Sequence, residues 1–383
     1  MGLDPGSLAN RQGDPGQATG PLPRCRNNCR RLSGAKAQGF GVSAGRGRGL
    51  SAEDRDAFQQ DGVVCLRNVL TSGEIEKLRA GVAQQMERLG RSKTGYDFEA
   101  FGKQVWDPVR PVETGTANRF DMQAMKEIIQ ADPAACPLLE EDASDSEGLF
   151  FYDVAAWKTD PGVRMVAFDS ALPGIAAELL DARYLNFWED TTFVKAPHTR
   201  QKTAFHQDLA YFQIEGEQCV IVWIPLDAAD DGTGVMQYIR GSHRWGETFA
   251  PNAFVSRTSF PSSPHPKCPD IEGNLAAYDI VSFQVKPGDV IIHHVMTVHG
   301  AGGNRSDLWR RAMSFRYCGD DVRYFDRPGA LKQAGGAAGL RDGDRLFSKD
   351  YPVVWPKPWP GFRLSPVYDA RQIGWDLERA RYT

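Results

Sequence analysis

The sequence predicts a mainly β protein of the α+β class, with a jelly-roll, cupin-like core of two stacked sheets flanked by N-terminal helices. Two observations predict this fold. Helical hydrophobic patterns occur before residue 182, and short β-rich runs separated by turn residues follow up to residue 320. Helices that precede many closely spaced strands are typical of a double-sheet barrel with a helical flank.

We expect one disordered tail and one folded domain. Residues 1–48 are rich in Gly, Arg and Pro and show no periodicity, so they cannot bury enough apolar surface to offset the entropy of ordering. A transit peptide and a wrongly assigned start are the alternatives for this segment. Residues 49–383 are expected to form a single domain in three parts: a helical flank at 49–182, a jelly-roll core at 183–320 and a C-terminal wrap at 321–383.

The composition is ordinary for a soluble globular protein. Hydrophobic residues make up 41% of the chain and charged residues 25%. The net charge of −4 gives no reason to expect a nucleic-acid partner. No apolar run has the length of a membrane span, and Cys219–Leu226, among the longest, indicates a buried strand. The expected partner is a small-molecule substrate, and the sequence does not specify an oligomeric state.

Cysteine usage indicates a reducing compartment. The seven cysteines are an odd and scattered set, which is not typical of a disulfide framework: Cys25, Cys29, Cys65, Cys136, Cys219, Cys268 and Cys318. Disulfides are rare where thiols are kept reduced, so we expect a cytoplasmic protein.

The first folded elements are a helix and a short strand. Ser51, with Asp54 three residues later, is typical of a helix N-terminus, and Asp61-Gly62 ends the helix. A second helix is predicted from apolar residues at helical spacing, which we expect to face the core: Ile75, Leu78, Val82, Met86 and Leu89. A third covers Leu172–Leu180.

Residues 91–150 give no clear assignment, and the acidic run from Glu140 to Glu147 is expected to be a solvated loop. From residue 184 onward, β-rich runs alternate with turn signals such as Pro287-Gly288-Asp289. The predicted strands are Val63–Leu66 near the start of the domain and then Tyr184–Lys195, Val220–Pro225, Met236–Ile239, Ala277–Val285, Val290–His294 and Ala312–Tyr317.

Histidine placement points to a metal site in the β-rich half, since all seven histidines lie between His198 and His299. His206 and Asp208 are two residues apart, and on a strand such residues share a face. Two imidazoles and one carboxylate are the usual ligands of a non-haem ferrous ion with open positions. His299, at the end of the strand that begins at Val290, is the candidate for the second imidazole.

His293 and His294 compete with His299 for this role. Adjacent strand residues face opposite ways, so at most one of His293 and His294 points inward; we expect His294 to line the pocket or orient a ligand. The same alternation applies to Arg310 and Arg311. An inward arginine would hold the free carboxylate of an acidic cosubstrate or would pair with a structural Asp or Glu, and the sequence leaves both readings open.

At these residues the chain resembles the phytanoyl-CoA dioxygenase family of Fe(II)/2-oxoglutarate oxygenases. The resemblance covers roughly residues 50 to 320, and the order of its segments is more specific than any single one. The segments are Phe58–Val64, Phe205–Phe212, Val222–Asp227, Gly241–His243, Lys286–Asp289, and His299–Asn304 followed by Arg310.

The resemblance implies a double-stranded β-helix fold, with iron held by His206, Asp208 and His299. It implies that Arg310, eleven residues after the last ligand, binds the distal carboxylate of 2-oxoglutarate and that Trp223 borders this cosubstrate. Family members often carry a hydroxyl residue where this chain has Ala301, and we expect Thr297 to substitute for it.

The implied reaction is hydroxylation of an unactivated C–H bond with release of succinate and CO2. It uses Fe(2+), 2-oxoglutarate and O2, and the carboxylate of Asp208 favours oxidation over halogenation because related halogenases have a small residue there. Two alternatives keep the barrel: a non-redox, metal-dependent cupin-like enzyme and a catalytically silent binding protein. Four aromatic residues are candidates either for a substrate pocket or for core: Tyr211, Phe212, Trp245 and Phe249.

Overall fold

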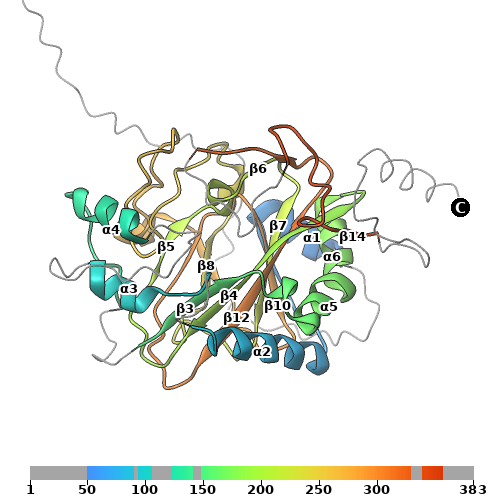
Figure 1. Cartoon of the computed structure of the whole chain (residues 1–383), viewed down its shortest axis with the longest axis horizontal. Coiled ribbons are helices and arrows are strands. Elements are labelled where there is room, and N and C mark those ends of the chain that lie inside the picture. Colours follow the sequence, from blue (N-terminus) through green and yellow to red (C-terminus); the bar gives the residue numbers. More distant parts are fainter. Residues whose placement is uncertain (1–49, 90–93, 106–121, 141–147, 329–338, 357–383) are drawn as a thin grey trace, which may run out of the picture. The chain divides into compact units, whose positions relative to one another are not determined.

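The computed structural model describes residues 50–89, 94–105, 122–140, 148–328 and 339–356, which all belong to one compact unit, Val42–Thr383 (Figure 1). The predicted tail at 1–48 lies outside the described residues, as does all but the first residue of the acidic run that starts at Glu140. Within the described part of the chain, no helix has both the length and the apolar character needed to cross a membrane.

The six α-helices of the described residues all lie before residue 181. The bounds are α1 Ala52–Asp61, α2 Ser72–Met86, α3 Phe98–Val105, α4 Met122–Ala131, α5 Pro161–Asp169 and α6 Leu172–Leu180. Ser51 and Asp54 form a capping box at the start of α1, and Gly62 ends it in the left-handed conformation, as predicted. The predicted third helix is α6, with the same bounds.

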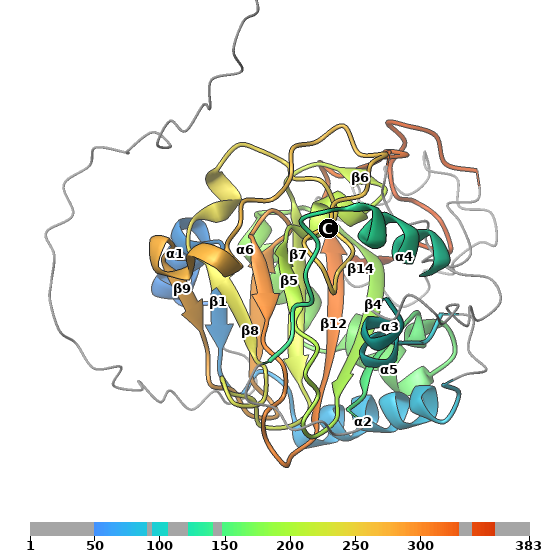
Figure 2. The ribbon, with the colours of Figure 1, turned by 90° about the vertical axis from the view of Figure 1, so that its left-hand side faces the viewer.

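Two antiparallel sheets form the core, as predicted (Figure 2). The larger sheet has the order β1 (Val63–Leu66), β10 (Val290–His294), β7 (Cys219–Pro225), β12 (Arg310–Cys318), β4 (Leu185–Lys195), β3 (Phe150–Val154) and β2 (Tyr96–Asp97), with β14 (Val353–Trp355) also paired to β4. The smaller sheet has the order β5 (Thr203–His206), β11 (His299–Ala301), β8 (Met236–Ile239) and β9 (Ile280–Ser282). A separate ribbon pairs β6 (Ile214–Glu215) with β13 (Arg323–Tyr324).

The two faces of the larger sheet have different partners. One face packs against α1, α2, α5 and α6 through alternate residues such as Val222, Ile292 and Phe315, all fully buried. The other face carries the intervening residues, among them Trp223 and His293, and it faces the pocket described below. Because side chains alternate along a strand, one face of the sheet forms the apolar core with the helices and the other face lines the pocket.

Three local predictions need correction. Asp208 does not continue the strand of His206, because β5 ends at His206 and a 3-10 helix begins at Asp208. His299 does not end the strand that starts at Val290; it begins β11, in the other sheet. Much of the predicted strand Ala277–Val285 is irregular, and β9 covers only Ile280–Ser282.

Glu140 also differs from its prediction as a solvated residue. Its carboxylate accepts a hydrogen bond of 3.0 Å from the backbone N–H of Gly303, just after β11, and its side chain is only 16% exposed.

The described part of the C-terminal segment packs onto the larger sheet, where the ring of Tyr351 stacks on that of Trp188 at 4.7 Å.

Candidate active site

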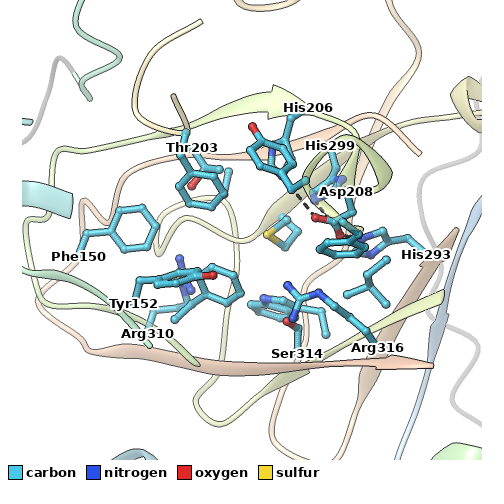
Figure 3. Close-up of a pocket in the computed structure, with 18 residues that line it drawn as sticks. Phe150, Tyr152, Thr203, His206, Asp208, His293, His299, Arg310, Ser314 and Arg316 are labelled. Atoms are coloured by element: carbon cyan, nitrogen blue, oxygen red, sulfur yellow. Dashed lines mark hydrogen bonds and ion pairs between the residues drawn. The ribbon is translucent and has the colours of Figure 1, made fainter. Parts of the chain in front are cut away.

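A pocket lies between the two sheets, with mostly aromatic walls (Figure 3). Its polar side chains come from both sheets and from the 3-10 helix after β5. The lining residues that carry nitrogen or oxygen groups are Tyr152, Thr203, His206, Asp208, Tyr211, Trp223, His293, His299, Arg310, Ser314 and Arg316.

His206, Asp208 and His299 converge at this pocket. One ligand-type atom from each lies within 4.8 Å of the others, and all three residues are buried. His206 and His299 are direct cross-strand partners in the β5–β11 pair, which places their rings side by side with centroids 4.4 Å apart. The turn into the 3-10 helix brings Asp208 Oδ1 to 3.8 Å from Nε2 of His206. The structure thus brings together the three residues predicted to hold a metal.

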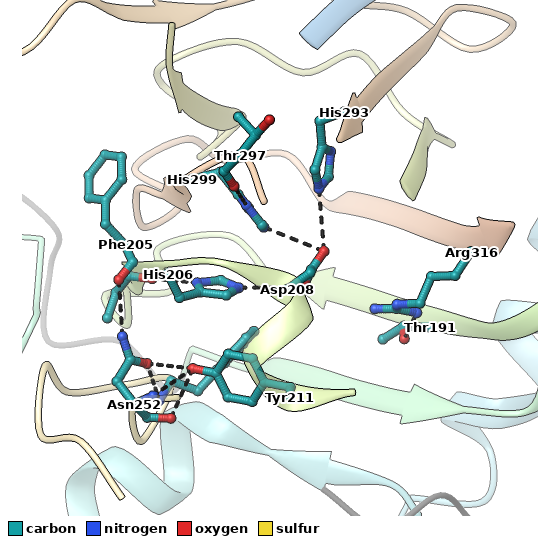
Figure 4. Close-up of polar contacts among 12 residues, drawn as sticks. Thr191, Phe205, His206, Asp208, Tyr211, Asn252, His293, Thr297, His299 and Arg316 are labelled. Carbon is teal, nitrogen blue, oxygen red and sulfur yellow. Dashed lines mark hydrogen bonds and ion pairs between the residues drawn. The ribbon is translucent and has the colours of Figure 1, made fainter. Parts of the chain in front are cut away.

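Backbone carbonyls fix both imidazole rings (Figure 4). Nδ1 of His206 donates to the Ala204 carbonyl at 2.7 Å, and Nδ1 of His299 donates to the Thr297 carbonyl at 2.9 Å. A carbonyl oxygen only accepts, so each ring carries its proton on Nδ1 and presents the lone pair of Nε2. This is the tautomer that binds a metal ion through Nε2.

The charges at the cluster also suit a cation. Burial would raise the pKa of Asp208, but the neighbouring His299, His206 and His293 outweigh it and hold this pKa well below its usual range. Burial, together with the other imidazoles, holds the pKa of His299 well below its usual range. The cluster therefore offers an ionised carboxylate at Asp208 and a neutral nitrogen donor at His299, the protonation states that ligation requires.

His293 is a third imidazole beside the cluster. Its Nε2 donates to Asp208 Oδ2 at 3.3 Å, and it is 1% exposed. One of the His293–His294 pair points inward, as alternation predicts, but the choice of His294 was wrong. His294 lies on the helix side of the sheet near Phe58 and His243, where burial lowers its pKa to about 4.

Arg310 and Arg311 face opposite ways, as predicted. Arg311 binds Asp227 with two hydrogen bonds from its guanidinium, of 2.9 and 2.7 Å. Arg310 is 2% exposed and lines the pocket, and its Nε has no hydrogen-bond partner among the described residues. Burial lowers the pKa of Arg310 to about 10, which leaves it charged at neutral pH. The structural ion pair thus belongs to Arg311, and Arg310 is left for a ligand.

Of the other two residues predicted to bind the cosubstrate, one lines the pocket. The ring of Trp223 lies 6.0 Å from the guanidinium carbon of Arg310. Thr297 departs from the prediction, because its hydroxyl donates to the Gly62 carbonyl at 2.8 Å and it is not among the pocket residues. Its part in the site is the backbone carbonyl that orients His299.

Sequence reasoning missed Arg316 and Ser314. Both lie on the same face of β12 as Arg310, since all three line the pocket and occupy alternate-residue positions of this strand. If Arg310 points into the pocket, strand alternation in the sequence predicts that Ser314 and Arg316 do so too. Of the aromatic candidates, Tyr211 and Phe212 line the pocket, whereas the other two, Trp245 and Phe249, belong to a separate apolar cluster.

Known proteins share this combination of sequence and fold. A family model described as phytanoyl-CoA dioxygenase (PhyH) matches residues 58–312. The peroxisomal phytanoyl-CoA dioxygenase of Rattus norvegicus is 22% identical over 304 residues, which cover 74% of this chain and 73% of the rat protein. A probable phytanoyl-CoA dioxygenase of Caenorhabditis elegans is 22% identical over 290 residues, covering 74% of this chain and 80% of its own length.

A solved structure is similar in fold. The non-heme alpha ketoglutarate dependent carbocyclase SnoK from nogalamycin biosynthesis aligns with a TM-score of 0.55 at 22% identity, covering 80% of this chain and 96% of its own. At this level of identity the likeness concerns the fold, a jelly-roll of two sheets.

Proposed function

The chain belongs to the phytanoyl-CoA dioxygenase family, and from this premise we propose that it hydroxylates an unactivated C–H bond of a small organic substrate. It is an oxygenase that depends on Fe(II) and 2-oxoglutarate, and the proposed reaction consumes O2 and releases succinate and CO2. One observation carries the proposal: a buried cluster of two imidazoles and a carboxylate shares a pocket with a buried arginine whose Nε has no partner among the described residues.

The donor set fits iron. His206, Asp208 and His299 would occupy one side of a ferrous ion and leave positions for other ligands, as in non-haem iron oxygenases. Their Nδ1 hydrogen bonds hold the two rings in the ligating orientation before any metal arrives, which lowers the cost of binding. These three residues are our proposed iron ligands.

The arginine fits the cosubstrate. A guanidinium held away from water is costly unless an anion pairs with it. The distal carboxylate of 2-oxoglutarate would supply that anion to Arg310, and Trp223 beside it would border the cosubstrate's chain. Arg310 and Trp223 are our proposed cosubstrate-binding residues.

When bound, iron with 2-oxoglutarate and O2 supplies the oxidising power that a C–H bond requires. The residues of the chain position these groups and keep water away. Aromatic residues of the pocket, including Phe150, Phe193 and Phe254, contribute apolar wall surface that limits the entry of water. Asp208 occupies a ligand position with its own carboxylate, which favours hydroxylation.

Substitution of Asp208 by Ala tests the proposal. It should abolish iron-dependent formation of succinate from 2-oxoglutarate and should also abolish the rise in melting temperature that Fe(II) or Mn(II) gives the wild type. Asp279→Asn, which changes an exposed carboxylate, serves as the control and should behave as wild type.

Anaerobic spectroscopy separates the proposal from its alternatives. Fe(II) plus 2-oxoglutarate should give a weak visible charge-transfer band in the wild type and none in Asp208→Ala. A non-redox metal enzyme would bind the metal without this band, and a silent binding protein would form no succinate with any substrate. Full turnover by Asp208→Ala would remove the ligand assignment.

A further inference from the structure

We propose that Arg316 is a second anion-binding residue of the pocket and that the primary substrate therefore carries a carboxylate or a similar oxyanion. This inference rests on the proposed function, in which Arg310 is already committed to 2-oxoglutarate. It narrows the substrate to an organic anion with an apolar body.

Arg316 reaches the pocket at a different place from Arg310. Arg316 lies six positions after Arg310 on the same face of β12, which corresponds to about 20 Å between their α-carbons. In Figure 3, Arg310 lies beside Tyr152, whereas Arg316 lies beside Ser314, on the side of His293. Arg316 lines the same pocket as Asp208 and His293, so it lies on the side of the proposed iron site.

The guanidinium of Arg316 is buried and incompletely bonded. It is 5% exposed, and its Nε has no hydrogen-bond partner among the described residues. Nη1 donates to the hydroxyl of Thr191 at 2.5 Å, and the guanidinium carbon lies 5.1 Å from the ring centre of Phe212. These are neutral partners, and a buried guanidinium calls for an anionic one.

Among the described residues, no carboxylate forms an ion pair with Arg316. Glu189 lies directly opposite Arg316 in the β4–β12 register, yet no ion pair within 4.0 Å joins them in the described structure. In the proposed enzyme the charge of Asp208 is directed to the metal. The space next to Arg316 is the pocket itself.

A charge balance leads to the same conclusion. Among the pocket-lining side chains, the carboxylate of Asp208 offsets the charge of Arg310, and the two charges of Fe(II) offset those of 2-oxoglutarate. The charge of Arg316 is left over. A substrate with one negative group would compensate it, and the surrounding Phe212 and Ile221 would accept the apolar remainder of that molecule.

Matched acid and amide probes test this assignment. Acetate and acetamide, phenylacetate and phenylacetamide, and octanoate and octanamide are titrated calorimetrically into the protein loaded anaerobically with Fe(II) and 2-oxoglutarate. In at least one pair the wild type should bind the acid roughly 10- to 100-fold more tightly than the amide, as expected for a charged hydrogen-bonded pair. Arg316→Met should lose this preference without weakening the amide, and Arg316→Lys should restore part of it.

Arg311→Met is the matched control, because Arg311 lies on the opposite face of the same strand, and it should keep the acid preference. Three results would overturn the proposal. The first is that the wild type binds acid and amide with equal affinity in every pair, or binds neither. The second is that Arg316→Met weakens the binding of acid and amide equally, and the third is that Arg316→Met keeps the acid preference but no longer binds 2-oxoglutarate. The last would assign Arg316 to the cosubstrate.

The proposed function fails separately. If the wild type forms no complex with Fe(II) and 2-oxoglutarate, the function is wrong, and the same titration on the metal-free protein still reports whether Arg316 selects anions. If that complex forms but no acid preference is seen, the function stands and only the inference about Arg316 falls.

Discussion

The hydroxyl of Thr297 donates a hydrogen bond of 2.8 Å to the carbonyl of Gly62, a residue 235 positions earlier in the chain. Gly62 ends the first helix, and the carbonyl of Thr297 orients the ring of His299. The geometry of a proposed iron ligand therefore depends on how the N-terminal helix ends.

Gly62→Ala should damage both stability and metal binding. Gly62 has φ +75°, and an added Cβ would lie 2.5 Å from the Thr297 hydroxyl and 2.3 Å from Nδ1 of His243. We expect a loss of at least 1–2 kcal/mol in the free energy of unfolding, because the left-handed conformation alone costs about that much. Urea unfolding and Fe(II) titration measure the two effects.

Gly73→Ala is the control for this substitution, since it adds the same methyl group within helix α2 where nothing lies within 4 Å. It should stabilise the protein slightly. If Gly62→Ala unfolds at the same urea concentration as the wild type, the link through Thr297 is not important.

We expect Arg310→Met to impair binding of 2-oxoglutarate and Arg311→Met to affect only the stability of the fold. Loss of a charged, two-pronged contact should raise the KM for 2-oxoglutarate roughly 100-fold in Arg310→Met. Arg311→Met removes a partly exposed ion pair with Asp227, so it should cost at most about 1 kcal/mol of stability and leave this KM unchanged. Steady-state kinetics of succinate release decide the matter, and equal effects of the two variants would contradict the assignment.

His293→Phe should weaken metal binding without abolishing it. Its Nε2 hydrogen bond to Asp208 holds that carboxylate in place, and loss of such a supporting contact typically costs 10- to 100-fold in metal affinity. The neighbouring His294→Phe alters the helix side of the same strand and should leave metal affinity near that of the wild type. Mn(II) titration followed by electron paramagnetic resonance provides the comparison. A complete loss of binding in His293→Phe would make His293 a ligand.

Asp190 should make stability decrease as pH rises. Burial raises the pKa of Asp190 to about 7, although the backbone N–H groups of Trp157 and Ala156 donate to its carboxylate. An unfolded aspartate ionises near pH ~3.9, so between about pH 4 and pH 7 the folded state binds more protons than the unfolded state. This contribution is fully present below about pH 4, declines up to about pH 7 and is absent above it.

Asp190→Asn should remove that slope. The free energy of unfolding of the wild type, minus that of the variant, should fall by up to about 4 kcal/mol between pH 4 and pH 8. Urea unfolding across this range tests it, with the exposed Asp279→Asn as control. Curves for wild type and Asp190→Asn that stay parallel would show that Asp190 is not proton-linked.

Local patterns were sufficient for much of the fold. The capping box at Ser51 and the turn at Gly62 defined α1, and alternation along β12 correctly separated Arg310 from Arg311. Helices α3, α4 and α5 were not predicted. Two of them, α3 and α4, lie before residue 150 and are strongly amphipathic, so apolar residues at helical spacing mark them in the sequence. Helix α5 begins at Pro161, and its N-cap Asp160 is likewise a signal that the sequence contains.

Long-range pairing explains most of the site errors. Whether β11 belongs to the sheet of β10 or to the other sheet depends on its partner β5, about 100 residues away, which no local pattern encodes. The hydrogen bond from the Thr297 hydroxyl to the Gly62 carbonyl also joins segments that are far apart in the sequence, so no local pattern predicts it. The cytoplasmic location inferred from the cysteines stays a prediction.

The placement of the proposed ligands has a consequence for cohesion. His206 and His299 belong to the smaller sheet, whereas Arg310 and Arg316 belong to the larger one. A cosubstrate that contacts both iron and Arg310 would bridge the two sheets, so its binding free energy would add to the cohesion of the sandwich. Ligand saturation should therefore slow the separation of the sheets and protect the amides of β5 and β11 from hydrogen exchange.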